Sequence, residues 1–291
     1  MRILVLGVTG TIGHATWRTL QDNRLYDVWG TLRSEHALSY FTEYSHAKLI
    51  TGVDVLNQDN LIRVFEKVRP EVVINGTGLI KQLITANDPI AVLPINAIFP
   101  HQLAQICSIS NARLIQISTD CVFSGKKGNY VESDMSDAED LYGKSKFIGE
   151  ICQLSHVVTI RTSTIGHELT TQYALLDWFL SQKDSVKGYV NAIYSGIPTF
   201  ELASVIRDYV LSNEKLSGLY HVAAKPISKY DLLQLIAERY NKKINIEPDE
   251  AVCIDRSLCA GRFNEQTGYL PAQWPILIEK LYQSRQFVGA V

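Results

Sequence analysis

The chain has 291 residues, a formal net charge of −2, 46% hydrophobic residues and 20% charged residues. This is the composition of an ordinary globular protein with a sizeable core. It excludes a basic surface for nucleic acid or for an anionic membrane. No apolar stretch approaches the roughly 20 residues of a membrane span, and the short apolar run at 2–6 indicates a first strand rather than a signal peptide. The five cysteines show no Cys-x-x-Cys spacing, which favours free thiols in a reducing cytosol.

Strand-like and helix-like segments alternate over the first 160 residues. Apolar runs predict strands at 2–6, 27–31, 47–51, 72–74, 114–117 and 157–160. Helical spacing of apolar residues predicts helices at 11–20, 57–69, 94–109 and 142–154. Continuous apolar strands that alternate with helices are typical of a parallel sheet covered on both faces. We therefore predict an α/β fold with a Rossmann-type doubly wound parallel sheet.

The pattern after residue 161 is less regular. We expect helices at 175–180, 200–211, 232–240 and 274–287, and a strand at 219–222. Residues 1–160 are predicted to form the NAD(P)-binding domain, to which 193–223 return. Residues 161–192 and 224–291 are predicted to form a smaller α/β substrate-binding lobe.

A glycine-rich segment joins the first strand to the first helix. Its glycines have the spacing GxxGxxG, which permits a tight turn and lets backbone N–H groups at a helix N-terminus face a pyrophosphate. The residues of this loop predicted to bind a dinucleotide are Gly7, Thr9, Gly10, Thr11, Ile12 and Gly13.

The end of the second strand indicates which dinucleotide is bound. A NAD site usually carries an acid about 20 residues after the glycines, to bind a ribose 2′-hydroxyl. This chain has Arg33 there, followed by Ser34. A guanidinium suits a 2′-phosphate, so the sequence favours NADPH, with NADH as the alternative. A solvated surface arginine is the competing interpretation.

Two further strand ends are expected at the cofactor. Asp54 and Val55 follow the third strand, and Asp54 could accept a bond from an adenine amino group. Asn75, Gly76 and Thr77 follow the fourth strand and would bring backbone close to the cofactor again.

A hydroxyl, a phenol and an ammonium group form the candidate catalytic set. Thr119 ends the fifth strand, and Tyr142 and Lys146 lie four residues apart on one face of a predicted helix. A neighbouring ammonium lowers the pKa of a tyrosine from about 10, so we expect Tyr142 to exchange protons near neutral pH. Alone, a Tyr-x-x-x-Lys pair is weak, because most such pairs belong to a solvated helix face.

The segments GVTGTIG, ISTDCVFSG and YGKSKFIGE resemble those of the extended short-chain dehydrogenase/reductases. Within that superfamily the chain resembles the dTDP-4-dehydrorhamnose reductase family, whose motifs are Ser-Thr-Asp-Tyr-Val-Phe and Tyr-Gly-Lys-x-Lys-x-x-Gly-Glu. Residues 118–123 and 142–150 match them except at Cys121, where tyrosine is usual. The later segments at 196–199, 218–221 and 255–258 also fit, so the resemblance spans nearly the whole chain.

The resemblance implies a nucleotide-linked 4-keto-6-deoxy-sugar as substrate, reduced at C4 with NADPH in a cytoplasmic pathway to a surface polysaccharide. Tyr142 would protonate the C4 oxygen, Lys146 would hold the nicotinamide ribose and Thr119 would orient the carbonyl. A homodimer is compatible with the resemblance.

A second set of candidate residues would contact the substrate. Arg256 is a candidate for the substrate diphosphate, and His167 could line the sugar pocket. Lys81 and Gln82 resemble a Lys-Gln run of UDP-N-acetylglucosamine dehydratases, although a solvated lysine is an equal alternative. The full set is Lys81, Asp120, Cys121, His167 and Arg256. His221 is expected to be a core histidine.

No protein-held metal is predicted, because Glu132, Asp134 and Asp137 form no ligand set with a histidine. Three alternatives stay open. The substrate could be a UDP-linked 4-keto N-acetylamino sugar. An epimerase or dehydratase is disfavoured, since dehydratases commonly carry Asp-Glu where this chain has Asp120 and Cys121. A non-catalytic regulator is the third, because the beta subunit of methionine adenosyltransferase resembles the same family.

Overall fold

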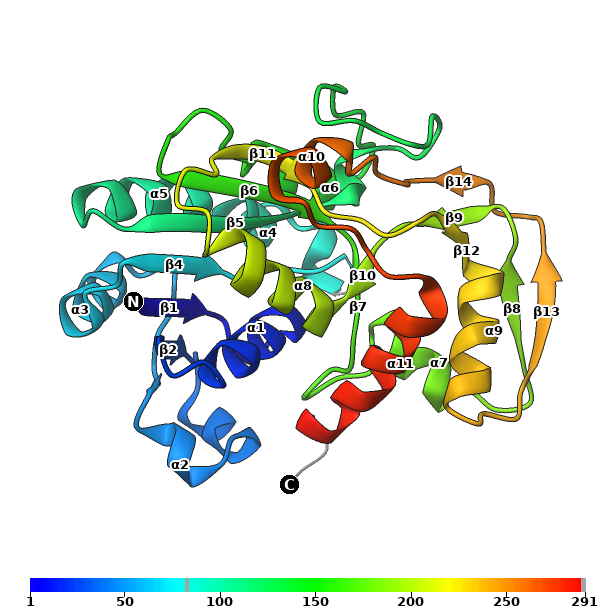
Figure 1. Ribbon diagram of the computed structural model, residues 1–291, viewed down its shortest axis with the longest axis horizontal. Helices are drawn as coiled ribbons and strands as arrows, with labels where there is room; N and C mark the ends of the chain where they lie inside the picture. The colour runs from blue at the N-terminus through cyan, green and yellow to red at the C-terminus, as the bar shows by residue number, and fades with distance from the viewer. Residues whose placement is uncertain (82–83, 289–291) are drawn as a thin grey trace.

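Seven parallel strands form one sheet in the residues described by the computed structural model, 1–81 and 84–288 (Figure 1). Their order is β11-β6-β5-β4-β1-β2-β3, so the direction of winding reverses between β1 and β4. The strands are β1 Arg2–Leu6, β2 Asp27–Thr31, β3 Leu49–Ile50, β4 Val72–Asn75, β5 Arg113–Thr119, β6 Val157–Thr162 and β11 Gly218–His221. The predicted α/β class and doubly wound parallel sheet are confirmed.

Each face of the sheet has its own hydrophobic core. Ile3 and Val5 of β1 belong to one core and Leu4 and Leu6 to the other, because successive side chains of a strand point to opposite faces. The first core includes side chains of α1 Thr11–Gln21 and α8 Thr199–Val205, which pack against each other (Figure 1). The second includes side chains of α3 Gln58–Val68 and α5 Phe99–Ile109. Helices therefore cover both faces.

The C-terminal part of the chain adds small sheets beside the large one (Figure 1). Their strands are β7 Thr164–Ile165, β8 Ser185–Tyr189, β9 Ala192–Tyr194, β10 Ile197–Pro198, β12 Ile227–Ser228, β13 Asn245–Asp249 and β14 Ile254–Asp255. The helices here are α7 Leu175–Ser181, α9 Lys229–Arg239, α10 Gly261–Thr267 and α11 Trp274–Ser284. Between them, β11 returns to pair with β6. The predicted division into two lobes stays a prediction.

The remaining helical segments are short. They are η1 Glu35–Tyr40, α2 Glu43–His46, η2 Ile84–Asn87, α4 Pro89–Leu93, η3 Pro94–Ile98, η4 Asp120–Val122, α6 Leu141–Ile148, η5 Ile206–Val210 and η6 Arg285–Phe287. Helix α6 ends at Ile148, so the predicted extension to Leu154 is wrong. Gly149 caps the helix, and a Cβ there would lie 2.0 Å from the carbonyl oxygen of Asn96. The packing against η3 thus stops the helix.

One apolar helix corrects the expectation that no stretch approaches the length of a membrane span. Within the described residues, Pro89–Ile109 is a 21-residue helix with a mean hydropathy of 1.3 in its most apolar window. Of that window 44% is buried, and Phe99, Leu103 and Cys107 lie in the core beside the sheet. A core helix meets the same length and composition criterion, so this is weak evidence for a membrane.

A buried ion pair joins the segment after α6 to the sheet. Arg161 of β6 donates from Nε to Oε1 of Glu150 (2.8 Å) and from Nη2 to Oε2 (2.7 Å). Both side chains are 3% exposed. The Ser118 hydroxyl of β5 donates to the same carboxylate at 2.6 Å. The carboxylate of Glu150 therefore accepts hydrogen bonds from both β5 and β6.

Glu150→Ala should lower the free energy of unfolding by about 3–5 kcal/mol, because it leaves the Arg161 guanidinium buried without its counter-charge. Urea denaturation measures the change. The control is Glu139→Ala, which removes the exposed partner of Lys126 and should have little effect. Similar losses in both variants would contradict the special importance of the buried pair.

Candidate functional site

The glycine loop has the backbone geometry of a pyrophosphate cradle. Gly7 has a φ of +74°, and the N–H of Gly10 donates to its carbonyl at 3.0 Å. A Cβ on Gly13 would lie 2.2 Å from the same oxygen, so the loop lies directly against the first turn of α1. Gly10 caps α1 without a side-chain acceptor, which leaves N–H groups of the first turn available to an anion.

The loop after β4 runs against this cradle. A Cβ on Gly76 would lie 3.1 Å from Cα of Gly13, so two predicted cofactor segments meet. The buried side chain of Asn75 accepts from the N–H (3.1 Å) and hydroxyl (2.6 Å) of Thr77 and donates to Gln116 at 2.9 Å. Asn75 thereby holds the shape of the loop. A contact of its side chain with the cofactor stays a hypothesis.

Arg33 and Ser34 follow the end of β2 and are exposed. Among the residues that the structure describes, Arg33 has no hydrogen bond or ion pair. Asp54 is also exposed, and its carboxylate accepts the N–H of Leu56 at 3.0 Å. These positions leave the guanidinium available for a phosphate.

Helix α6 meets the end of β5 at very short range. A Cβ on Gly143 would lie 2.2 Å from the carbonyl oxygen of Cys121, so only glycine permits this approach. Asp140 caps the helix by accepting the N–H of Gly143 at 2.7 Å. The Thr119 hydroxyl accepts from the N–H of Cys121 and donates to Asp120, both at 3.1 Å. The structure thus brings Tyr142, on this first turn, to the predicted threonine.

The electrostatics of the catalytic set differ from the expectation. Burial raises the pKa of Tyr142, and the neighbouring Cys121 and Asp120 raise it further. Burial also lowers the pKa of Lys146 to about 8, against an opposing effect of Glu150. The pKa of Tyr142 is therefore raised, whereas the sequence predicted that it would be lowered. The physical reason is that burial excludes water and disfavours the charged forms of both side chains. The Lys146 ammonium donates to the carbonyl of Ile117 at 2.8 Å.

Three of the predicted substrate residues gather beside Thr119. Asp120 is buried, and burial raises its pKa. Burial likewise raises the pKa of the Cys121 thiol to about 12, so this cysteine stays a neutral thiol. Arg256 comes from the far end of the chain, donates from Nε to the carbonyl of Phe123 at 2.8 Å and lowers the pKa of Asp120 by its charge.

The other two substrate candidates already have protein partners. The ammonium of Lys81 lies 2.6 Å from the carboxylate of Asp140, at the start of α6. Gln82 lies outside the described residues. Both ring nitrogens of His167 are engaged, with Asp177 at 3.2 Å and the Tyr240 hydroxyl at 2.8 Å. A sugar contact of His167 stays a hypothesis.

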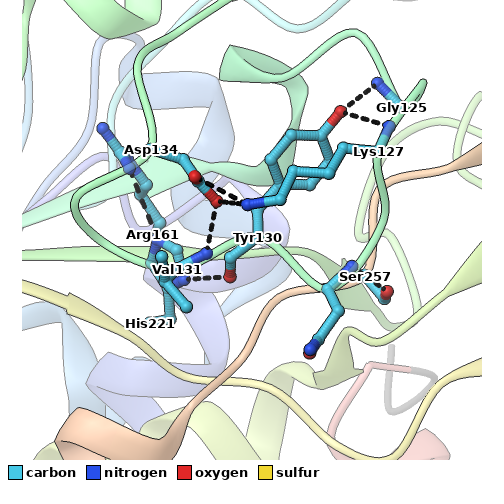
Figure 2. Close-up of polar contacts among 9 residues, drawn as sticks. Gly125, Lys127, Tyr130, Val131, Asp134, Arg161, His221 and Ser257 are labelled. Atoms are coloured by element: carbon cyan, nitrogen blue, oxygen red, sulfur yellow. Dashed lines mark hydrogen bonds and ion pairs between the residues drawn. The ribbon is translucent and has the colours of Figure 1, made fainter.

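The loop from β5 to α6 is fastened to the segment that carries Arg256. Figure 2 shows the Tyr130 hydroxyl accepting the N–H groups of Gly125 and Lys127, both at 3.1 Å. The N–H of Tyr130 donates to the carbonyl of Ser257 at 2.8 Å. His221 is fully buried, its Nδ1 lies 3.1 Å from the Tyr130 carbonyl and burial lowers its pKa to about 3. The expectation of a core histidine is confirmed.

The acidic residues of this loop serve as hydrogen-bond acceptors. Glu132 accepts the N–H of His221 at 2.9 Å, and Asp134 accepts from Lys127 in Figure 2. Asp137 accepts from both the N–H and the hydroxyl of Ser124. Within the described residues, no group of three or more His, Cys, Asp or Glu side chains is arranged to hold a metal.

Sequence reasoning missed Lys229, the first residue of α9. Its side chain is partly buried, and its charge lowers the pKa of Asp120 at the end of β5. No motif marked this residue, because a single lysine at a helix start has no distinctive spacing.

Comparisons with known proteins show the family of this chain and several similar proteins. The family described as RmlD substrate binding domain matches residues 1–255. A dTDP-4-dehydrorhamnose reductase from Aggregatibacter actinomycetemcomitans is 27% identical over 241 residues, 79% of this chain and 76% of that protein. The beta subunit of methionine adenosyltransferase 2 from Danio rerio is 25% identical over 254 residues, 82% of this chain and 74% of that protein.

A solved structure shares the fold. The dTDP-4-dehydrorhamnose reductase from Bacillus anthracis, in complex with NADP, superposes with a TM-score of 0.77 at 20% identity, covering 97% of this chain and 99% of that chain. At this identity the likeness shows the fold alone.

Gly13→Ala should weaken NADPH binding about tenfold or more, because the added Cβ would overlap the Gly7 carbonyl and push the loop out of shape. A fluorescence titration measures the affinity. Gly261→Ala is the matched control, since its Cβ would meet only the Cys259 sulfur at 3.6 Å. An unchanged affinity in Gly13→Ala would rule out the cradle as the cofactor site.

Proposed function

Because the chain belongs to the RmlD substrate binding domain family, we propose that it is an NADPH-dependent reductase of the C4 keto group of a nucleotide-linked 4-keto-6-deoxy-sugar. The observation that carries this proposal is the close approach of α6 to the segment after β5, with the Tyr142 phenol interacting with the Thr119 side chain. The similarity to the reductase from Aggregatibacter actinomycetemcomitans supports the reaction.

The side chains divide the chemistry of reduction between them. Bound NADPH supplies a hydride to C4 of the sugar. Tyr142 donates a proton to the C4 oxygen, and its raised pKa means that the phenol carries this proton at neutral pH. The Thr119 hydroxyl orients the same oxygen, and the ammonium of Lys146 binds the ribose next to the nicotinamide.

The cofactor preference follows from the end of β2. The glycine loop would hold the pyrophosphate at the start of α1, and the exposed Arg33 would bind the 2′-phosphate of NADPH. The solved reductase from Bacillus anthracis with the same fold contains NADP, which supports this assignment. The product would enter surface polysaccharide synthesis in the cytoplasm, and a homodimer is compatible with the proposal.

A second candidate function is that of a regulatory subunit. The similarity to the beta subunit of methionine adenosyltransferase 2 from Danio rerio favours it. A regulator binds a partner protein and oxidises no NADPH, whereas a reductase oxidises NADPH when it is given its substrate. The retained Thr119, Tyr142 and Lys146 favour the reductase.

Tyr142→Phe should lower kcat by about a hundredfold or more, because it removes the proton donor and leaves the ring in place. The assay follows the loss of NADPH absorbance with a panel of dTDP- and UDP-linked 4-keto-6-deoxy-sugars, including N-acetylamino sugars. Tyr44→Phe is the control, since Tyr44 is 96% exposed. Failure of the unmodified protein to turn over any sugar while it binds NADPH would count against the reductase and favour the regulator.

The pH dependence of kcat/KM should show an alkaline limb near pH 8. Burial lowers the pKa of Lys146 to about 8, so its ammonium is present below that pH and is lost as the pH rises through it. Tyr142 should not set this limb, because burial raises its pKa. A profile that stays flat well above pH 8 would contradict a role for charged Lys146. Lys144→Met, on the same helix, is the control and should keep the limb.

A further inference from the structure

The segment 166–174, between β7 and α7, begins beside the glycine loop. A Cβ on Gly166 would lie 2.3 Å from Oγ1 of Thr199, at the start of α8, and 3.1 Å from Cγ2 of Thr11. Thr11 is the first residue of α1 and belongs to the predicted dinucleotide-binding loop. The residues after Gly166 therefore leave the sheet beside the candidate cofactor site.

Side chains rather than backbone pairing hold this segment. In the part of the chain that the structure describes, no residue from 168 to 173 has a hydrogen bond between its backbone and another backbone group. The Glu168 carboxylate instead accepts the Thr171 hydroxyl and the N–H of Ala174, both at 2.7 Å. These two bonds close the segment on itself, so other contacts must attach it to the rest of the protein.

His167 and the N–H of Glu168 attach the segment to α7 through one carboxylate. One oxygen of Asp177 lies 3.2 Å from Nδ1 of His167, and the other accepts the N–H of Glu168 at 2.6 Å. The side chains of His167 and Asp177 are only 11% and 16% exposed. Breaking this contact would leave polar groups unpaired where little water reaches them, which favours the closed arrangement.

Tyr240 attaches the segment to α9, at whose C-terminal end it lies. Its hydroxyl is 2.8 Å from Nε2 of His167, and its ring packs against Tyr282 of α11 with centroids 5.0 Å apart. Burial raises the pKa of Tyr240, so the phenol keeps its proton and donates a hydrogen bond to Nε2. The ring N–H of His167 is then at Nδ1 and donates to Asp177.

We propose that His167 is a positioning residue, which holds the segment 166–174 against the candidate cofactor site through Asp177 and Tyr240 and thereby slows the release of NADPH. This role uses both ring nitrogens of His167 and leaves neither for a sugar. A segment held by side chains can open without breaking the sheet, which suits the exchange of a cofactor. The identity of the cofactor as NADPH rests on the proposed function.

The experiment measures the rate of NADPH release from the full chain by stopped-flow fluorescence, without a sugar. Tyr240→Phe should raise this rate about fivefold, because one partly buried hydrogen bond is lost while the ring stays. His167→Leu should raise it about tenfold or more, because both bonds of the imidazole are lost. The double variant should release NADPH no faster than His167→Leu, because Tyr240 acts through His167.

Tyr209→Phe is the matched control for Tyr240→Phe. Tyr209 is also partly buried and packs on another tyrosine ring, that of Tyr269, but its hydroxyl has no hydrogen bond among the described residues. Its substitution should leave the release of NADPH unchanged.

Digestion with chymotrypsin gives a second readout that needs no cofactor. Tyr173 lies in the segment and is 56% exposed, so His167→Leu should speed cleavage after Tyr173 about fivefold, as measured by mass spectrometry. Tyr44, which is 96% exposed in α2, is the internal control, and its cleavage should not change. Faster cleavage at both sites would indicate general unfolding and overturn the positioning role.

Unchanged release of NADPH in both single variants, or additive effects in the double variant, would also overturn the proposal. So would a higher KM for the sugar with unchanged release, which would make His167 a sugar contact. Turnover separates this proposal from the function. If no sugar is reduced but both variants release NADPH faster, the role of His167 stands and the reductase fails. If sugars are reduced and the release rates do not change, the reductase stands and the role of His167 fails. Failure of the unmodified protein to bind NADPH would overturn both.

Discussion

The buried pair of Glu150 and Arg161 is the interaction on which the site depends. A buried ion pair stabilises a fold only when its hydrogen bonds are well satisfied, since both charges lose their hydration. Here two donors of the guanidinium and the hydroxyl of Ser118 meet one carboxylate. Ser118 directly precedes Thr119, and Glu150 follows the helix that carries Lys146. The pair therefore ties the end of α6 to the strands beside it, while the contact at Gly143 sets the other end.

Exclusion of water, which requires the buried charges of Glu150 and Arg161 to be paired, also shifts the pKa values of the candidate catalytic residues. Burial raises the pKa of Tyr142 and lowers that of Lys146, so both groups move toward their neutral forms. A neutral phenol can give a proton to a reduced carbonyl, whereas a phenolate would suit the reverse reaction. Lys229 and Arg256 of the C-terminal part bring positive charge to this interior, and their charges lower the pKa of the buried Asp120 against the effect of its burial. The candidate site thus combines the Tyr142 phenol from α6 with cationic side chains from the C-terminal part of the chain.

Predictions from the sequence succeeded where local pattern carries the information. The alternation of strands and helices, the glycine turn after β1 and the helix with Tyr142 all follow from periodicity or from spacing within a few residues. Predictions failed where distant packing decides. Helix α6 ends at Ile148 because Gly149 lies against the carbonyl of Asn96, and its apolar periodicity alone would have continued. The apolar helix Pro89–Ile109 was predicted only from residue 94, because a proline is common in the first turn of a helix and Pro94 suited its start.

The sequence by itself determined the class of fold and the place of the glycine turn after β1, because these depend on near neighbours along the chain, and its motifs named the candidate catalytic residues. Only the tertiary structure decided the ionisation of Tyr142 and the environment of Lys229. Desolvation depends on every group packed around a side chain, and the convergence of Lys229 with Asp120 depends on strand pairing between segments far apart in the chain. A motif carries neither kind of information.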